Sequence, residues 1–296
     1  MKAFLLAIGV AVTAAALASC SSSTVAALTE TGVRATGGEP EKARAVGQSA
    51  GQFAGSFAPL PWETEYAIGG GIALKSFSEQ GQLHPSDQLQ EYVTKVGLAI
   101  VAKTPRAGFP FAFAVVDRDD VNAWAAPGDY VFITAGAIRA MEDESELAGV
   151  LAHEIAHVTR GHMVRMMQNT QRFAAIAQGV QAGLEKDIPQ LTQTVDLGHT
   201  IIFERGLDKD MELEADTLGV EYAAATGYDP KGLYRFLTRL EQRSTGKGGG
   251  WLTSTHPPLN TRIAGIRAKI SNDLVGIDGA VAKERFQAMT AKALAQ

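Results

Sequence analysis

The sequence has little of what several protein classes require. It holds a single cysteine, Cys20, among 296 residues, so an internal disulfide and dithiol redox chemistry are excluded. It has no dense basic run, and its formal net charge of −5 argues against a nucleic-acid binder. Beyond the N-terminus no stretch is long and apolar enough to span a bilayer. The C-terminal part shows no 34-residue helical repeat, so we expect no repeat domain there.

What remains is the composition of an ordinary globular protein, with 46% hydrophobic and 20% charged residues. A chain of this length can bury the core of one large domain or two small ones. The N-terminus is the exception. An apolar run from Ala3 to Leu17 follows Lys2 and ends, after small residues, at Cys20. The run is short for a membrane span and suits the hydrophobic region of a signal peptide.

This N-terminal pattern resembles a bacterial lipoprotein signal. It predicts a signal peptide over residues 1–19, a lipidated Cys20 with a flexible Ser, Thr, Gly and Ala-rich tether over residues 20–61, and a folded domain over residues 62–296. Several acyl chains would anchor the protein stably to a membrane. An Asp directly after the lipidated cysteine would imply retention at the inner membrane. Ser21 at this position therefore favours the outer membrane, with the domain facing the periplasm. The alternative is an ordinary signal peptide with an incidental cysteine.

The most informative stretch is His153-Glu154-Ile155-Ala156-His157. Asp143 can cap the start of a helix here, and Gly161 can end it. On that helix His153 and His157 are four residues apart and project from one face. Two neutral imidazoles on one face can share one Zn²⁺, and Glu154 can reach a water activated there and take its proton. The alternative is a pair of partly buried helix histidines that meet by chance.

A second motif lies downstream, where Glu212 and Asp216 fall one turn apart on a predicted helix that Asp208 can cap. A catalytic zinc takes three protein ligands and keeps one open position, and Glu212 is the candidate third ligand. Asp216 can accept the other N–H of a ligand histidine and fix its tautomer. The alternative is an acidic, solvated helix face, which is the expectation for Glu214.

The three segments HEIAHVTRGH, ELEADTLG and THPPLNTRI, beginning at His153, Glu212 and Thr255, occur in this order. Together they resemble the zinc endopeptidase family that contains the CaaX prenyl protease, the HtpX heat-shock protease and the mitochondrial Oma-type protease. The small bacterial periplasmic lipoprotein members are the most similar. The resemblance runs from about Glu63 to the C-terminus. It departs at Asp208 and Lys209, where the family often has Ser-Arg.

This resemblance implies a zincin-like (gluzincin) domain, mainly α with a small β-hairpin sheet, that binds one Zn²⁺ per chain. The metal ligands are then His153, His157 and Glu212, with Glu154 as general base. Two functional roles remain open for His256, and the alternative to both is a structural loop residue followed by Pro257-Pro258. As in some periplasmic relatives it can act as a removable fourth ligand that gates the metal, or it can stabilise the oxyanion. Arg262 and Arg205 are further oxyanion or structural candidates. His84, His162 and His199 have no motif support and are expected to be structural or exposed.

The remaining elements are expected as follows: a helix over 63–76 interrupted at Gly69-Gly70-Gly71, a helix over 87–103, a strand over 111–116, and a hairpin of 122–126 and 130–134 around Pro127-Gly128-Asp129. In relatives the strand at Asn122, Ala123 and Trp124 borders the cleft, so an extended substrate can add to that edge. The alternative for Trp124 is a core aromatic. Residues 163–207 are either a mobile lid or a packed helix.

The expected function is therefore a membrane-anchored periplasmic zinc metalloendopeptidase. Its expected partners are misfolded or unassembled outer-membrane proteins as substrates, and the membrane through the lipidated N-terminus. The alternative is a non-proteolytic chaperone or assembly factor for outer-membrane proteins that uses the same cleft. An intact Glu154 favours the enzyme, because binding alone does not need a general base.

Overall fold

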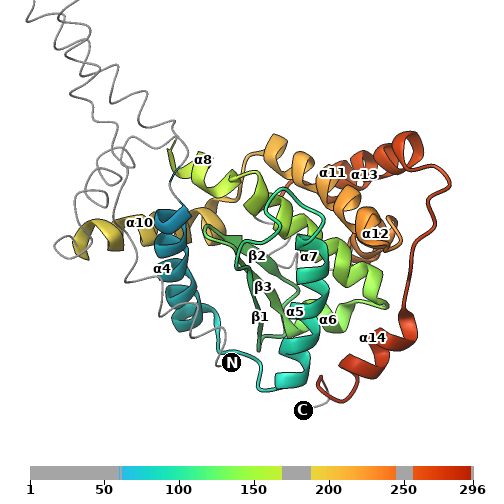
Figure 1. Cartoon of the computed structure of the whole chain (residues 1–296), viewed down its shortest axis with the longest axis horizontal. Helices are drawn as coiled ribbons and strands as arrows, with labels where there is room; N and C mark the ends of the chain where they lie inside the picture. Colours follow the sequence, from blue (N-terminus) through green and yellow to red (C-terminus); the bar gives the residue numbers. More distant parts are fainter. Residues whose placement is uncertain (1–59, 61, 169–187, 245–255, 295–296) are drawn as a thin grey trace, which may run out of the picture.

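The computed structural model describes residues 60, 62–168, 188–244 and 256–294 (Figure 1). The helices are α4 (Trp62–Gln80), α5 (Asp87–Val101), α6 (Ala135–Ala140), α7 (Glu144–Thr159), α8 (His162–Gln168), α10 (Ile188–Thr200), the π-helix η1 (Ile201–Arg205), α11 (Lys209–Thr226), α12 (Gly232–Ser244), α13 (Leu259–Asp273) and α14 (Lys283–Thr290); the strands are β1 (Ala112–Val116), β2 (Ala123–Ala126) and β3 (Tyr130–Thr134). The described chain is thus mainly helical with one small sheet, as predicted.

The sheet separates two hydrophobic cores. Strand alternation sends Phe113 and Val115 into a core shared with α5, α7, α11 and α12, and sends Ala114 and Val116 into a core shared with α4, α8 and α10. Figure 1 shows the same arrangement, with α4 and α10 on one side of the sheet and α5 and α7 on the other. Both faces of the sheet are therefore covered by helices, which explains why β1 and β3 are buried along their whole length.

The predicted hairpin is present, and the sheet is larger than the hairpin alone. Its strand order is β1-β3-β2; β2 pairs antiparallel with β3, and β1 pairs parallel with β3. The turn places Gly128 and Asp129 at φ values of 73° each. Within the described residues β2 pairs with β3 alone, so its other side is a sheet edge.

The expected interruption of the first helix at three glycines is wrong. Helix α4 continues without a break from Trp62 to Gln80. A Cβ on Gly69 would lie 1.7 Å from the carbonyl oxygen of Pro127. Glycine is there because the hairpin turn lies against the helix, and this close backbone contact stabilises a helix that glycine on its own disfavours.

Helix α7 begins and ends as its sequence predicts. Asp143 accepts a hydrogen bond from the Glu146 backbone N–H, and Glu146 in turn accepts one from the backbone N–H of Glu142 at 2.9 Å. Arg160 caps the C-terminus, and Gly161 follows in the left-handed region with φ 59°. The N-cap of α11 differs: Asp208 occupies the position, but its side chain makes no capping hydrogen bond.

Three predictions fall wholly or partly outside the described residues. They are the signal peptide over 1–19, the tether over 20–61 apart from residue 60, and the middle of the proposed lid, residues 169–187. The described parts of the lid region form α8, α10 and η1, and they pack against the sheet and α4. Among the described helices, none combines the length and the apolar character needed to cross a bilayer.

Candidate metal centre and cleft

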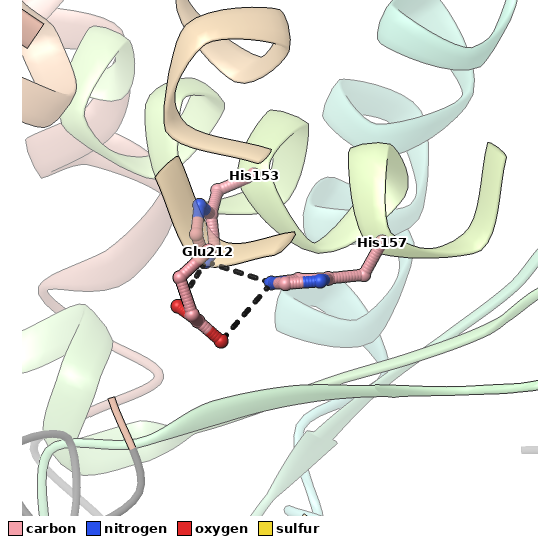
Figure 2. A group of neighbouring side chains, drawn as sticks. All are labelled: His153, His157 and Glu212. Carbon is pink, nitrogen blue, oxygen red and sulfur yellow. Dashed lines mark hydrogen bonds and ion pairs between the residues drawn. The ribbon is translucent and has the colours of Figure 1, made fainter. Parts of the chain in front are cut away.

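Helices α7 and α11 bring the three predicted ligands together. His153 and His157 come from α7 and Glu212 from α11, and Figure 2 shows their side chains pointing toward one another. The two Nε2 atoms lie 3.1 Å apart, and each lies 3.6 Å from a carboxylate oxygen of Glu212. The helices approach closely because α11 carries Gly219, where a Cβ would lie 2.9 Å from the backbone nitrogen of His153.

This cluster fits a zinc ion. One nitrogen from each histidine and one oxygen of Glu212 lie within 4.8 Å of one another, and all three side chains are buried. Glu212 Oε1 is buried and accepts no hydrogen bond from the described part of the chain. A buried carboxylate oxygen without a partner is costly unless a cation binds it. Two histidines and a glutamate are a donor set of catalytic zinc sites.

Glu154 lies beside this cluster and lines the same cleft. Its side chain is buried. Burial raises the pKa of Glu154, and the neighbouring Glu212 carboxylate raises it further, while His153, His256 and Arg262 oppose the rise. A carboxylate with a raised pKa is a stronger base than an exposed one, which suits proton transfer near neutral pH.

Asp216 and Arg262 support His153 from behind. Asp216 Oδ1 lies 3.0 Å from His153 Nδ1, and the Arg262 guanidinium donates to both Asp216 oxygens at 2.9 and 2.6 Å. Burial acts to raise the pKa of Asp216, but Arg262 and His153 outweigh it and hold that pKa well below its usual range. Arg262 is 1% exposed. It lines a smaller cavity that Glu154 also lines, and it does not line the main cleft. Arg205, the other candidate, is exposed at the end of η1.

His256 also reaches the cluster. Its Nδ1 lies 2.5 Å from Glu212 Oε2, and its ring centroid is 6.0 Å from that of His153. It stands just before α13, whose first turn begins at Leu259. Residues 245–255, which precede it, lie outside the described residues. The structure therefore places His256 against a candidate ligand.

The interpretation of His162 and Glu214 from sequence was incomplete. His162 is fully buried, and its Nδ1 lies 2.8 Å from Nδ1 of His157. Glu214 is not a freely solvated acid: it pairs with His162 Nε2 at 3.1 Å and with Arg160 Nε at 2.6 Å. The signal available in the sequence was a third histidine five residues after His157 with a glycine before it.

An apolar cleft opens beside the cluster. Glu154, His157, Glu212 and His256 are among the residues that line it. The walls come from the residues of β2 and from apolar side chains of α8 and η1, and Glu65 and Arg106 line a further part. An edge strand along an apolar cleft can pair with an extended peptide through main-chain hydrogen bonds.

The three residues predicted to border the cleft do not all line the same cavity. Ala123 and Trp124 line the cleft, whereas Asn122 lines a smaller adjoining cavity beside His153 and Glu154. Trp124 is 4% exposed, stacks on Phe132 at 5.1 Å and meets Phe203 edge-on at 5.3 Å. Trp124 is thus a core aromatic that also forms part of the cleft wall.

The matches to known proteins agree with this site. The model of peptidase family M48 matches residues 86–270, which include the candidate metal ligands, Glu154 and His256. The chain belongs to peptidase family M48. The predicted family resemblance is therefore confirmed, and with it membership of a metalloprotease family.

Three relatives illustrate the range of M48 proteins that this chain resembles. It is 30% identical to the beta-barrel assembly-enhancing protease of Yersinia pestis, over 75% of this chain and 46% of the relative. It is 28% identical to the metalloprotease YcaL of Escherichia coli strain K12, over 67% and 80% of the two chains. It is 25% identical to the mitochondrial metalloendopeptidase OMA1 of Arabidopsis thaliana, over 66% and 39%. This chain spans about half the length of the assembly-enhancing proteases that it matches.

Proposed function

We propose that this chain is a gluzincin-type zinc endopeptidase that cleaves internal peptide bonds of extended polypeptides. The observation that carries the proposal is that the cluster of His153, His157 and Glu212 lies with Glu154 at a cleft that β2 also lines. Zn²⁺ held by those three side chains supplies a Lewis acid that polarises a carbonyl and makes water a nucleophile near neutral pH.

The protein's own groups perform the remaining steps. β2 aligns the substrate through the edge that pairs with no other strand in the described part of the chain, with Ala123 and Trp124 at the cleft wall and Asn122, just before the strand, in the adjoining cavity. Glu154 takes the proton of the attacking water on a carboxylate oxygen, and then delivers it to the leaving amine. Asp216 accepts from His153 Nδ1 and keeps Nε2 of that ring directed toward the metal position.

We further propose that the substrates are misfolded or unassembled outer-membrane proteins, cleaved in the periplasm by an enzyme anchored through lipid on Cys20. The support is the lipoprotein-like N-terminal sequence and the name of the Yersinia pestis relative, beta-barrel assembly-enhancing protease. A second function, chaperone or assembly factor without cleavage, is favoured by the apolar cleft, which can bind an unfolded chain without hydrolysing it.

Glu154→Gln distinguishes these functions. We expect the parent to bind one zinc per chain, and the variant to bind zinc equally but to cleave a reduced, alkylated protein about 10²–10⁴-fold more slowly, because only the general base is lost. Glu91→Gln, an exposed change on α5, is the control. A well-folded parent without zinc after metal is added back would refute the enzyme. Full cellular function of Glu154→Gln would favour the chaperone.

A further inference from the structure

The turn after α7 brings a third histidine onto the candidate ligand His157. Gly161 has φ 59°, a conformation that glycine adopts without the steric cost of a Cβ. Its backbone N–H donates to Val158 O at 3.0 Å, and its carbonyl accepts from the Arg165 N–H at 2.9 Å. Helix α7 therefore ends at this residue, and α8 begins directly after it with the His162 ring packed against that of His157.

The hydrogen-bond partners of His157 and His162 define the tautomer of each ring. His157 directs Nε2 toward the other candidate ligands, so a neutral ring that ligates through Nε2 carries its proton on Nδ1. That proton points at Nδ1 of His162, 2.8 Å away, which must then accept. His162 consequently carries its own proton on Nε2, which lies 3.1 Å from Glu214 Oε2, an acceptor. Every donor in the series therefore meets an acceptor.

We propose that His162 and Glu214 form a positioning relay that fixes the ring orientation and the Nδ1-protonated tautomer of His157 for metal binding. The inference rests on the zinc site of the proposed function and assigns a role to two residues outside the ligand set. Neither residue touches substrate or metal; both act through His157. Partners of this kind contribute to metal affinity because they hold a ligand ring in place and raise its basicity.

The two candidate histidine ligands are supported in different ways. His153 meets a buried carboxylate directly, Asp216, whose charge is balanced by Arg262. His157 meets a neutral imidazole, and the carboxylate that follows, Glu214, is 32% exposed. Arg160 and Arg165 pair with Glu214 at 2.6 and 3.5 Å at that surface.

The reason for this difference is charge. Glu154, Glu212 and Asp216 already bury three carboxylates around the cluster. A fourth buried carboxylate against His157 would carry a large desolvation cost without a guanidinium to balance it. A neutral imidazole transmits the orienting hydrogen bond and leaves the negative charge near solvent, where two arginines accompany it.

The test measures metal binding by the full chain and does not depend on turnover. We expect His162→Leu to weaken zinc affinity by about 10–100-fold in competition with a chromophoric chelator. Co²⁺ bound to this variant should show a shifted visible absorption spectrum, because the His157 ring is no longer held. His162→Asn places an amide oxygen near the lost acceptor and should restore most of the affinity. Glu214→Leu should cause a smaller loss of roughly tenfold.

His84→Leu is the matched control, because His84 is also buried but accepts a hydrogen bond from the Ser86 backbone N–H, away from the cluster. This control should leave both the zinc affinity and the Co²⁺ absorption spectrum unchanged. Parent zinc affinity and an unshifted Co²⁺ spectrum in His162→Leu and Glu214→Leu would overturn the relay. Equal losses in His162→Asn and His162→Leu without a spectral shift would also overturn it, in favour of packing alone. If His162→Leu fails to fold, the partly exposed Glu214→Leu decides. A folded parent that binds no zinc overturns the proposed function instead.

Discussion

The guanidinium of Arg262 forms a two-pronged hydrogen-bonded ion pair with the carboxylate of Asp216, with Nε to Oδ2 at 2.9 Å and Nη2 to Oδ1 at 2.6 Å. Both side chains are buried. This pair joins α13 to α11 directly behind His153. The THPPLNTRI segment therefore contributes Arg262 to the candidate metal centre. Arg262 contacts Asp216, which in turn contacts the candidate ligand His153.

Breaking this pair should destabilise the protein. We expect Arg262→Leu to lower the free energy of unfolding by about 3–5 kcal/mol, because Asp216 keeps its buried charge and loses its cation. Arg262→Lys should recover part of the loss, since an ammonium supplies charge without the guanidinium fork. Urea denaturation measures the effect, and Arg267→Leu, an exposed change on the same helix, is the control. Equal stability of Arg262→Leu and the parent would refute this role.

The contact between α4 and the hairpin turn gives a second prediction. We expect Gly69→Ala to destabilise the fold by about 1–3 kcal/mol or more, because the new Cβ meets the Pro127 carbonyl, which is backbone and cannot rotate away. Gly265→Ala is the matched control: on α13 the new Cβ would meet only Leu213 Cδ2 at 3.9 Å. There alanine should stabilise the helix by about 0.5–1 kcal/mol. Thermal unfolding of both variants measures these two effects. An unchanged Tm for Gly69→Ala would contradict the close contact between α4 and the hairpin turn.

His256 should restrain the resting enzyme. It lies 2.5 Å from Glu212 Oε2 and lines the cleft, so we expect it to compete for the open metal position until substrate displaces it. His256→Ala should then raise basal cleavage and self-digestion while zinc content stays at the parent level. A fall in kcat of about a hundredfold would instead assign oxyanion stabilisation. A peptidase assay with no change in either direction would leave His256 a structural residue.

The N-terminal sequence predicts lipid attachment. We expect Cys20→Ala to abolish incorporation of labelled fatty acid and to leave uncleaved precursor or mislocalised protein, because the acylated thiol and the cleavage site are lost together. Ser21→Asp is the companion variant: it should keep the label but retain the protein at the inner membrane. Unchanged fractionation and acyl labelling of Cys20→Ala would rule out the lipoprotein.

Local geometry explains which parts of the fold and site could be predicted from the sequence. The four-residue spacing of His153 and His157 places both rings on one helix face, and the same rule sets Glu212 and Asp216 one turn apart. Asp143 and Gly161 mark the ends of α7 for equally local reasons, and Pro127-Gly128-Asp129 marks the hairpin. Each of these patterns spans a few residues, so backbone geometry alone decides it.

Contacts between separate elements could not be predicted from the sequence, because they depend on how closely those elements approach one another. Gly69 stays helical through contact with a turn that lies far along the chain, and β1 joins β3 in parallel. The packing of α13 on α11 places Arg262 against Asp216, and the turn at Gly161 places Nδ1 of His162 2.8 Å from Nδ1 of His157. Spacing along each helix sets which candidate ligands and supporting residues share one face. Packing sets which buried groups contact and orient those side chains. Partners on different helices depend on the distance and angle between the helices, and not on spacing along the chain.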